Sequence, residues 1–251
     1  MIPVRGARGT QDSGRDEYDG LAGQLAALQL ADSAFPSGRY TLSHGLEALA
    51  QSGWLDGPDL WTKLLDVLEG YLRFGVATSD GVALACAHRA TGRGPDVSSI
   101  VEADRRLHAA KLSREAREAS TRTGRALLRT AESAFPNPHL AEYADRVLAG
   151  RTPGNHAVVL GVLTASLSVP RLFAVASELH ALAAGWVSAA TRLALIDHRA
   201  AQALLHEVHP AIARASRDVA ERSVTEIGGC TPHLDVMSMQ HEEAELRLFA
   251  S

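Results

Sequence analysis

Apolar side chains recur every three or four residues along most of this chain, and that spacing is the strongest constraint on its fold. It is clearest over 59–76, where the apolar residues fall on one face of a helix. They are Leu60, Trp61, Leu64, Leu65, Leu68, Tyr71 and Leu72. Asp59 stands at the N-cap position of this helix. Because the sequence has no long alternation of Val, Ile and Thr and no hairpin dipeptide between apolar runs, we predict an all-α protein.

Glycines and prolines divide the remaining sequence into segments of helical length joined by short connections. We predict further helices over 21–29, 43–51, 82–90, 98–132, 139–148, 155–167, 172–205 and 211–226, of which 98–132 and 172–205 can each be one helix or two. Asn155 is expected to cap the helix that follows it. Only 5% of the residues are aromatic, so Ala, Leu and Val must fill the core. The predicted architecture is an orthogonal bundle of about ten helices with a flexible C-terminal tail.

The two ends of the chain differ in composition from this helical domain, which we place at 21–227. Residues 1–20 mix glycines with charged side chains and are expected to form a disordered leader. Gly228, Gly229 and Pro232 begin a flexible tail over 228–251, whose last part is amphipathic. Apolar residues close to a terminus can become ordered on contact with another protein, so we expect this tail to bind a partner. Packing of the tail on its own domain is the alternative.

Charge and cysteine content exclude several classes of protein. The formal net charge is −4, so we expect neither nucleic acid nor a membrane to bind, and a transcription regulator would need a basic helix-turn-helix. No stretch reaches the roughly 18 to 20 apolar residues of a membrane-spanning helix, and no apolar segment follows the N-terminal arginines as in a signal sequence. Cys86 and Cys230 imply no disulfide framework. These features predict a cytoplasmic protein.

Side chains suited to catalysis or metal binding are few. The sequence contains no nucleophile elbow, no phosphate-binding glycine loop and no recognisable Cys–His frame, so we predict no enzymatic activity and no cofactor. His206 and His209 can share a helix face, but the second histidine comes one residue too early for a His-Glu-x-x-His zinc motif. Cys230 and His233 can hold a transition-metal ion transiently, since thiolate and imidazole both suit such an ion. We expect neither pair to be a permanent metal site; the alternative function is a helical metal-dependent enzyme that uses His206 and His209.

Three segments, taken together, resemble the UreF family of urease accessory proteins. Residues 28–49 resemble the family's N-terminal signature, in which Pro-x-Gly-x-aromatic precedes Ser-x-Gly-Leu-Glu. The matching residues are Pro36, Gly38, Tyr40, Ser43, Gly45, Leu46 and Glu47. The family's Arg-rich helix is matched by Gly124, Arg125, Leu127, Leu128 and Arg129. Its tail is matched by Met239, His241, Arg247, Leu248 and Phe249.

The resemblance covers 28–251, because 155–202 also fits the family's apolar middle in composition and phase. One departure is Ile196–Arg199, which stands where many members have Leu-Gly-Gln-Thr. A role that depends on that Gly or Gln is therefore not carried over to this chain.

The resemblance implies a helical, commonly dimeric accessory protein that helps to load nickel into urease. UreF proteins bind the UreD/UreH accessory protein, and this pair recruits the GTPase UreG while the assembly sits on apo-urease. Regulation of the GTPase has been proposed for the family. We therefore expect a homodimeric chaperone or scaffold with UreD/UreH, UreG and apo-urease as partners.

The resemblance also implies which residues bind partners. They are Tyr40, Ser43, His44, Glu47, Arg125, Arg247, Leu248 and Phe249. From the residues alone, Tyr40 can equally fill the core and Glu47 can bridge locally. Residues 101–130 carry eight basic and four acidic side chains. That balance fits either docking of an acidic partner or a solvated helix face with i,i+4 pairs.

Overall fold

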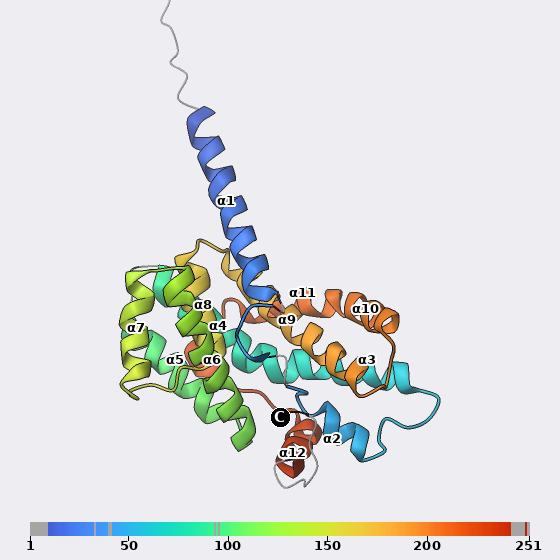
Figure 1. Ribbon diagram of the computed structural model, residues 1–251. Helices are drawn as coiled ribbons and strands as arrows, with labels where there is room; N and C mark the ends of the chain where they lie inside the picture. The colour runs from blue at the N-terminus through green and yellow to red at the C-terminus, as the bar shows by residue number, and fades with distance from the viewer. Residues whose placement is uncertain are drawn as a thin grey trace, which may run out of the picture.

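The computed structural model describes residues 10–32, 34–39, 42–92, 94, 96–241 and 249, and this part of the chain is helical and contains no strand. The predicted all-α fold is therefore confirmed. Figure 1 shows helices that cross one another in a body from which α1 projects. The elements are α1 (Thr10–Ala31), α2 (Leu46–Gln51), α3 (Leu60–Gly70), the π-helix η2 (Tyr71–Gly81), α4 (Val82–Gly92), α5 (Val97–Ala110), α6 (Arg114–Ala134), α7 (Pro138–Leu148), α8 (His156–Ser166), α9 (Arg171–Arg192), α10 (His198–Glu207), α11 (His209–Val219), the 3₁₀ turn η3 (Val224–Glu226) and α12 (Pro232–His241).

The helix predicted over 59–76 is the first part of a longer rod. In this rod α3, η2 and α4 follow one another without a break from Leu60 to Gly92. Asp59 occupies the N-cap position, but its side chain forms no capping hydrogen bond. Inside the rod, a Cβ added to Gly81 would lie 3.2 Å from Val219 Cγ2. The missing side chain therefore lets the rod pass close to α11.

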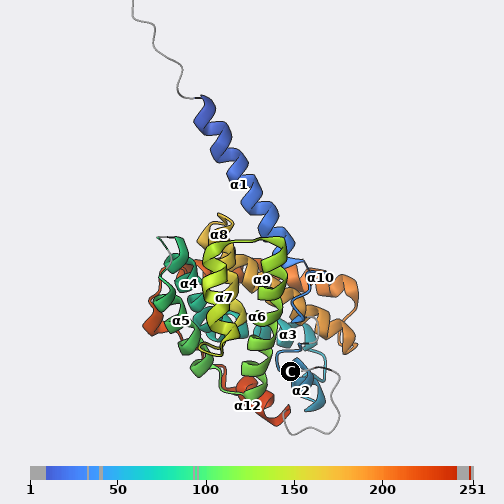
Figure 2. The same ribbon diagram turned by 60° about the vertical axis from the view of Figure 1, so that its left-hand side comes forward.

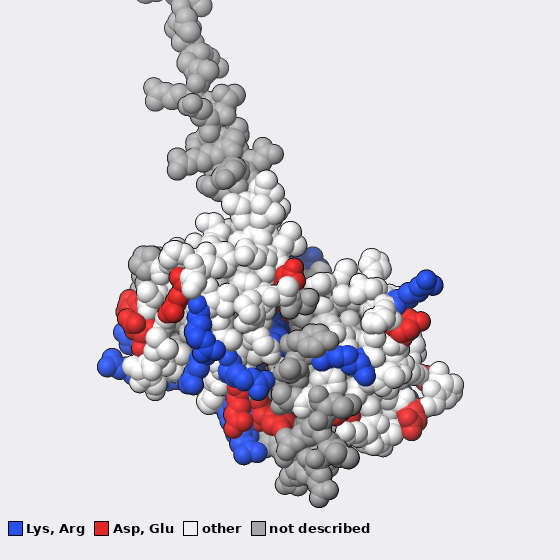
Figure 3. Space-filling view, in the orientation of Figure 1, with Lys and Arg blue, Asp and Glu red and all other residues white. Residues whose placement is uncertain are grey.

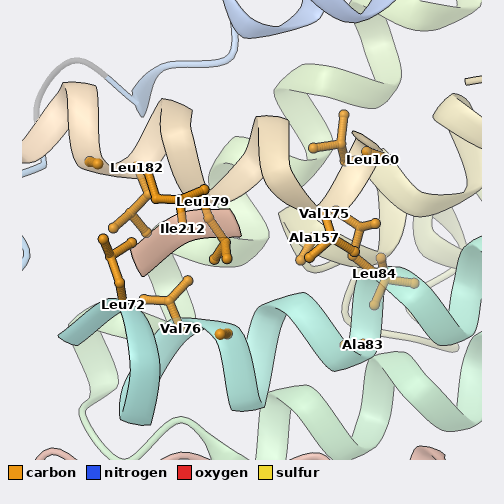
Figure 4. Close-up of a cluster of buried hydrophobic side chains, with 14 of the residues drawn as sticks. Leu72, Val76, Ala83, Leu84, Ala157, Leu160, Val175, Leu179, Leu182 and Ile212 are labelled. Carbon is orange, nitrogen blue, oxygen red and sulfur yellow. The ribbon is translucent and has the colours of Figure 1, made fainter. Parts of the chain in front are cut away.

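The core lies where the rod meets α8 and α9. Figure 4 shows Leu72 and Val76 of η2 opposite Leu179 and Leu182 of α9, and all four side chains are buried. α8 is buried on every side from its first residue to Thr164. It approaches the rod closely, because a Cβ added to its Gly161 would lie 2.5 Å from the Leu84 carbonyl oxygen. Compact residues thus allow the close helix packing that the low aromatic content indicated.

The central position of α9 explains its composition. Among the described residues, α9 is the one helix long and apolar enough to cross a membrane by length and composition, and half of its most apolar window is buried inside the fold. Its contacts within the bundle include the rod, α8, α10 and α11. The core helix of a globular domain passes the same test of length and composition, and α9 occupies such a position.

Two of the long stretches predicted to be helical each form two helices. The stretch 98–132 forms α5 and α6, and Ser113 between them caps α6 by accepting a hydrogen bond from the Ala116 N–H at 3.1 Å. The stretch 172–205 forms α9 and α10. Asn155 precedes α8 as predicted, but its side chain does not cap that helix. Instead its Nδ2 donates to the buried Asp104 carboxylate at 2.7 Å and ties α8 to α5.

The first and last helices, α1 and α12, lie at opposite ends of the body. α1 begins at Thr10 rather than at Leu21, so 10–20 of the expected leader is helical, and residues 1–9 lie outside the described residues. α12 occupies part of the expected flexible tail, and Figures 1 and 2 both place it beside α2, at the end of the body away from α1. Before α12, the N–H groups of Gly228 and Cys230 donate to the carbonyl oxygens of Thr78 and Phe74 in η2 at 3.1 and 2.9 Å.

Candidate partner-binding site

The N-terminal signature forms a tight turn that leads into α2. Gly38 has a φ of 74° and Gly45, the N-cap of α2, has a φ of 82°, a region that glycine adopts at little cost. His44 lies between them with a φ of 51°. The two signature glycines therefore have a backbone role, which holds whatever the turn binds.

Arg39 in this turn reaches back into the bundle. Its Nη1 donates to Glu178 Oε2 on α9 at 2.6 Å and lies 3.2 Å from His156 Nε2 on α8. Glu178 is only 4% exposed, and burial raises the pKa of its carboxyl even though the Arg39 charge opposes the shift. Burial, followed by the Arg39 charge, holds the pKa of His156 well below its ordinary value. The turn is thus fixed to the core by an ion pair between a partly buried arginine and a buried carboxylate, beside a neutral imidazole.

Further polar side chains surround the same place. His44 Nδ1 lies 3.4 Å from the Tyr71 hydroxyl, and burial together with the Arg39 charge lowers the pKa of His44 to about 3. Lys111 pairs with Asp80 at 2.8 Å. These groups and Ser238 of α12 line a cavity of about 100 Å³, which is large enough for a few water molecules.

The C-terminal tail packs against the N-terminal signature. Phe249 is 6% exposed, and its backbone N–H donates to Glu47 Oε2 at 3.2 Å. The guanidinium of Arg192 on α9 lies 4.3 Å from the centre of the Phe249 ring, within the range of a cation–π contact. Within α12, Ser238 Oγ donates to Ser113 Oγ at 3.1 Å. Two of the three family-like segments, far apart in sequence, therefore meet at Glu47.

The Arg-rich segment lies on α6, next to the turn. Gly124 must be a glycine here, because an added Cβ would lie 2.0 Å from the Gly154 carbonyl oxygen. Leu127 and Leu128 are buried, whereas Arg125 and Arg129 point to solvent. Figure 3 shows basic side chains over the region that α6 occupies in Figure 1.

An open groove of about 480 Å³ joins α6 to the turn. Its lining includes Arg129 of α6 and Pro36 of the N-terminal signature. The N-terminal signature and the Arg-rich helix therefore share this groove, and α6 also contacts α12 of the tail.

The predicted partner-binding residues fall into three groups. Arg125 is exposed and His44 is partly buried, while Ser43, Glu47 and Phe249 are buried in the chain's own fold. Outside the described residues lie Tyr40, Arg247 and Leu248. Phe249 packs on the chain's own domain, which is the alternative arrangement given for the tail.

Sequence reasoning missed the buried partners of the turn, Glu178 and His156. One signal was available for Glu178, since it is the only acidic residue in the mostly apolar stretch from Leu172 to Ala190. A lone carboxylate at that position needs a buried cation.

Of the residues considered for metal binding, His206 and His209 lie on α10 and α11, away from this region, whereas His233 belongs to α12. His206 and His209 are exposed, with ring centres 5.2 Å apart. His233 packs its ring against Trp54 at 5.5 Å, and the thiol of Cys230 is exposed. In the part of the chain that the structure describes, no group of three His, Cys, Asp or Glu side chains could hold a metal ion.

The segment that departs from the family pattern has a local role. Asp197 is the N-cap of α10, and its Oδ1 accepts hydrogen bonds from the N–H groups of Arg199 and Ala200 at 2.9 and 2.8 Å. Ile196–Arg199 therefore contains the start of a helix, a role that its Asp fulfils without the family's Gly or Gln.

Comparison with known proteins places this architecture in a class. The UreF family model matches residues 61–209, more than half of the chain. A protein of Trichodesmium erythraeum named urease accessory protein UreF is 33% identical over 231 residues, which are 92% of this chain and 98% of that protein. Proteins with the same name from an Arthrobacter species and a Bacillus species are 32% and 28% identical over 91% and 90% of this chain, and 97% and 98% of their own lengths.

The helical fold and these relatives define the class of this protein, the helical accessory proteins of urease. The chain belongs to the UreF family, which confirms the resemblance seen in its sequence.

Proposed function

We propose that this protein is a scaffold of urease maturation that binds the UreD/UreH accessory protein and recruits the GTPase UreG for nickel insertion into apo-urease. It works in the cytoplasm as a homodimer and performs no chemistry of its own, with nickel as the cargo of the assembly. Family membership and the printed names of the relatives support this role. They favour it over a metal-dependent enzyme built on His206 and His209.

One observation carries the proposal to a particular surface. The contact of Phe249 with Glu47 brings the C-terminal tail onto the N-terminal signature, and α12 lies beside α2 and α6. A partner that docks there meets parts of all three family-like segments at once. Tyr40, Arg247 and Leu248 are neighbours in sequence of Arg39 and Phe249, which belong to this surface.

The tail is tested by two deletions in a co-purification experiment with UreD/UreH. Removal of 235–251 should abolish co-purification while helical content by circular dichroism stays close to that of the intact chain. Removal of 242–251 alone leaves α12 in place and separates the role of the last residues from that of the helix. Retained binding by both truncated chains would remove the tail from the interface.

A substitution pair makes the same test without shortening the chain. Arg247→Ala should weaken co-purification with UreD/UreH. The matched control is Arg146→Ala, which removes an arginine from the exposed i,i+4 pair with Glu142 on α7 and should leave binding unchanged. Equal effects of both substitutions would contradict a specific role of Arg247.

Tyr40 is proposed to take part in recruitment of the GTPase. Tyr40→Ala should reduce the amount of UreG that joins the complex with UreD/UreH in a pull-down. An unchanged complex would show that Tyr40 has a structural role only.

The proposed homodimer has an apolar surface available on α1. Leu21, Leu25 and Leu28 are 53%, 58% and 64% exposed, and their spacing of four and three residues puts them on one face of this helix. Two single variants test this surface: Leu25→Asp changes the apolar face, and Gln24→Asp, at an exposed neighbouring position, is the control. Light scattering after gel filtration measures the mass of each variant. Loss of the dimer only in Leu25→Asp supports it, and an intact dimer in both would place the interface elsewhere.

A further inference from the structure

Three arginines of α6 form an exposed basic stripe. Arg122, Arg125 and Arg129 are spaced by three and four residues, so they lie on one face of the helix. All three are exposed, whereas the buried residues of α6, among them Leu127 and Leu128, belong to the face turned to the core. Figure 2 shows α6 on the near side of the body, where it packs beside α7. We call these three residues the arginine stripe.

The guanidinium groups of the arginine stripe have no partner among the described residues. None of the three forms a hydrogen bond or an ion pair through its side chain with that part of the chain. Glu118 is exposed and lies four residues before Arg122, yet the two do not pair. On α5, by contrast, Arg106 pairs with Glu102 at 2.9 Å. The i,i+4 pairing expected of a solvated face therefore describes α5 and does not describe the arginine stripe.

The last residue of the stripe lines the open groove of about 480 Å³ between α6 and the turn. Arg129 shares this groove with Ala126 of α6 and Pro36 of the turn, so the basic edge adjoins a surface of small side chains. Two exposed carboxylates, Glu118 and Glu132, follow the same face of α6 at the two ends of the stripe. A partner that matches this order of charges carries its acidic residues in the middle of the segment that docks.

We propose that the arginine stripe binds an acidic helix of a protein partner. Residues three and four apart on a helix have Cβ atoms about 5 to 6 Å apart, so carboxylates at positions i, i+3 and i+7 of the partner match the stripe in spacing. A guanidinium binds a carboxylate through two parallel hydrogen bonds, which fixes the register. Small apolar side chains of the same helix enter the groove beside Ala126. The net charge of −4 favours this occupant over nucleic acid, since only the local field is positive.

This inference rests on the proposed scaffold function and names the chemistry of one of its contacts. The groove beside the stripe reaches Pro36, four residues before Tyr40, for which recruitment of the GTPase is proposed. We therefore assign the acidic helix to UreG rather than to UreD/UreH. The contact adds a charged part to a surface that was otherwise defined by the turn and the tail.

Two triple variants of the full-length chain, which change the net charge equally, test the proposal. The stripe variant combines Arg122→Gln, Arg125→Gln and Arg129→Gln. The control variant makes the same change at three exposed arginines of α10 and α11, combining Arg199→Gln, Arg214→Gln and Arg217→Gln. Circular dichroism and urea denaturation show whether each variant has kept its fold. UreG is then titrated into the complex of each chain with UreD/UreH, at NaCl concentrations from about 50 to about 500 mM.

At the lowest salt concentration, the stripe variant should bind UreG at least about tenfold more weakly than the intact chain, since three charge pairs are lost. The control variant should stay within about twofold of the intact chain, because its substitutions lie on other helices. Added salt should weaken binding by the intact chain and should have a smaller effect on the stripe variant, because salt screens the charges that the variant no longer has.

Equal affinity of the stripe variant and the intact chain for UreG would overturn this inference and leave the scaffold function standing. So would an equal loss in the control variant, or weaker binding of the stripe variant to UreD/UreH instead of UreG. Binding of a short single-stranded DNA that is lost in the stripe variant would assign the stripe to nucleic acid and would also overturn it. If the intact chain forms no complex with UreD/UreH and UreG, the proposed function itself fails, and this inference fails with it.

Discussion

Removing the positive charge of Arg39 should destabilise the fold, and the size of the effect should depend on pH. Arg39→Met keeps the aliphatic stem and leaves Glu178 without the cation that lies 2.6 Å away. A buried carboxylate that loses its partner can take up a proton, which limits the cost. From its ordinary pKa of 4.5, protonation at pH 7 costs about 3.4 kcal/mol. The pKa of Glu178 is already raised in the intact chain, so part of this cost is present before the substitution. We therefore expect a loss of about 2 to 3 kcal/mol.

The same reasoning predicts that the loss shrinks in acid. A carboxyl whose pKa is raised in the folded state stabilises that state as pH falls, because the folded chain then binds the proton more readily than the unfolded chain. At pH 5 the limiting cost for Glu178 is only about 0.7 kcal/mol. His156 acts in the same direction, since without Arg39 its ring, 3.8 Å from the carboxylate, takes up a proton more easily.

The assay is denaturation by urea, followed by circular dichroism, at pH 7 and at pH 5. Arg106→Met is the matched control, because Arg106 forms an exposed i,i+4 pair with Glu102 and should cost less than about 0.5 kcal/mol at both pH values. A double variant, Arg39→Met with Glu178→Leu, should lose less stability than the sum of the single losses. The reasoning is refuted if Arg39→Met costs no more than the control at pH 7, or if its cost stays the same at pH 5.

Three further predictions concern stability and use the same assay. Gly124→Ala should cost about 2 kcal/mol or more, because its Cβ would lie 2.0 Å from the Gly154 carbonyl oxygen. The control is Gly185→Ala, whose Cβ would meet nothing within 4 Å and which should be neutral or slightly stabilising. Equal effects of the two substitutions would contradict the close approach at Gly124. Asp104→Ala should cost about 3 kcal/mol or more, since the buried N–H groups of Gly154 and Asn155 lose the carboxylate that accepts from them at 2.7 and 2.8 Å. A loss below about 1 kcal/mol would show that water takes the place of the carboxylate as acceptor. The pKa of His44 is lowered from 6.5 to about 3, so the unfolded chain binds a proton that the folded chain does not. The free energy of unfolding should therefore fall by up to about 1.4 kcal/mol per pH unit as pH drops below 6.5. His44→Asn should flatten that slope, and an unchanged slope would contradict the shift.

The sequence predicted those parts of the fold that depend on local periodicity. The apolar face of 60–72 was predicted from one helical period, and its Leu64, Leu68 and Leu72 are buried, whereas its Trp61 is exposed. Helices over 59–76 and 82–90 were predicted separately, and the sequence did not predict that they join into one rod through Gly81. In the structure Gly75 and Gly81 allow neighbours to come close, and a Cβ on either would lie 3.1 to 3.2 Å from the nearest atom. The π-helical geometry of η2 has no such local signal either.

The candidate site was only partly predictable, because its contacts join distant segments. The three family-like segments were recognised in the sequence. Whether Glu47 faces solvent, however, depends on Phe249, which is 202 positions away in sequence. Asn155 shows the same limit, since its side chain was expected to cap α8 and instead bonds to Asp104, 51 positions away. Residue type gives the bonding capacity of a side chain, whereas the fold decides where that capacity is used.

Whether the tail binds partners in its docked position is the question on which the mechanism of the scaffold depends. Docking buries Phe249 and forms one hydrogen bond with Glu47, contributions of about 2 kcal/mol and 1 kcal/mol. A partner that must first lift the tail loses about 3 kcal/mol, or roughly a hundredfold in affinity, whereas a partner that recognises the docked tail does not.

Phe249→Ala separates these two modes, because they predict changes of opposite sign. If UreD/UreH binds the tail as it lies on Glu47, the substitution weakens binding by undocking the tail; if the tail must leave, binding becomes tighter. We expect weaker binding, measured by titration with UreD/UreH, since the docked tail forms one surface with the N-terminal turn. Phe173→Ala, which truncates an exposed phenylalanine on α9, is the control and should leave the affinity unchanged. Tighter binding of Phe249→Ala would show that the docked tail inhibits assembly.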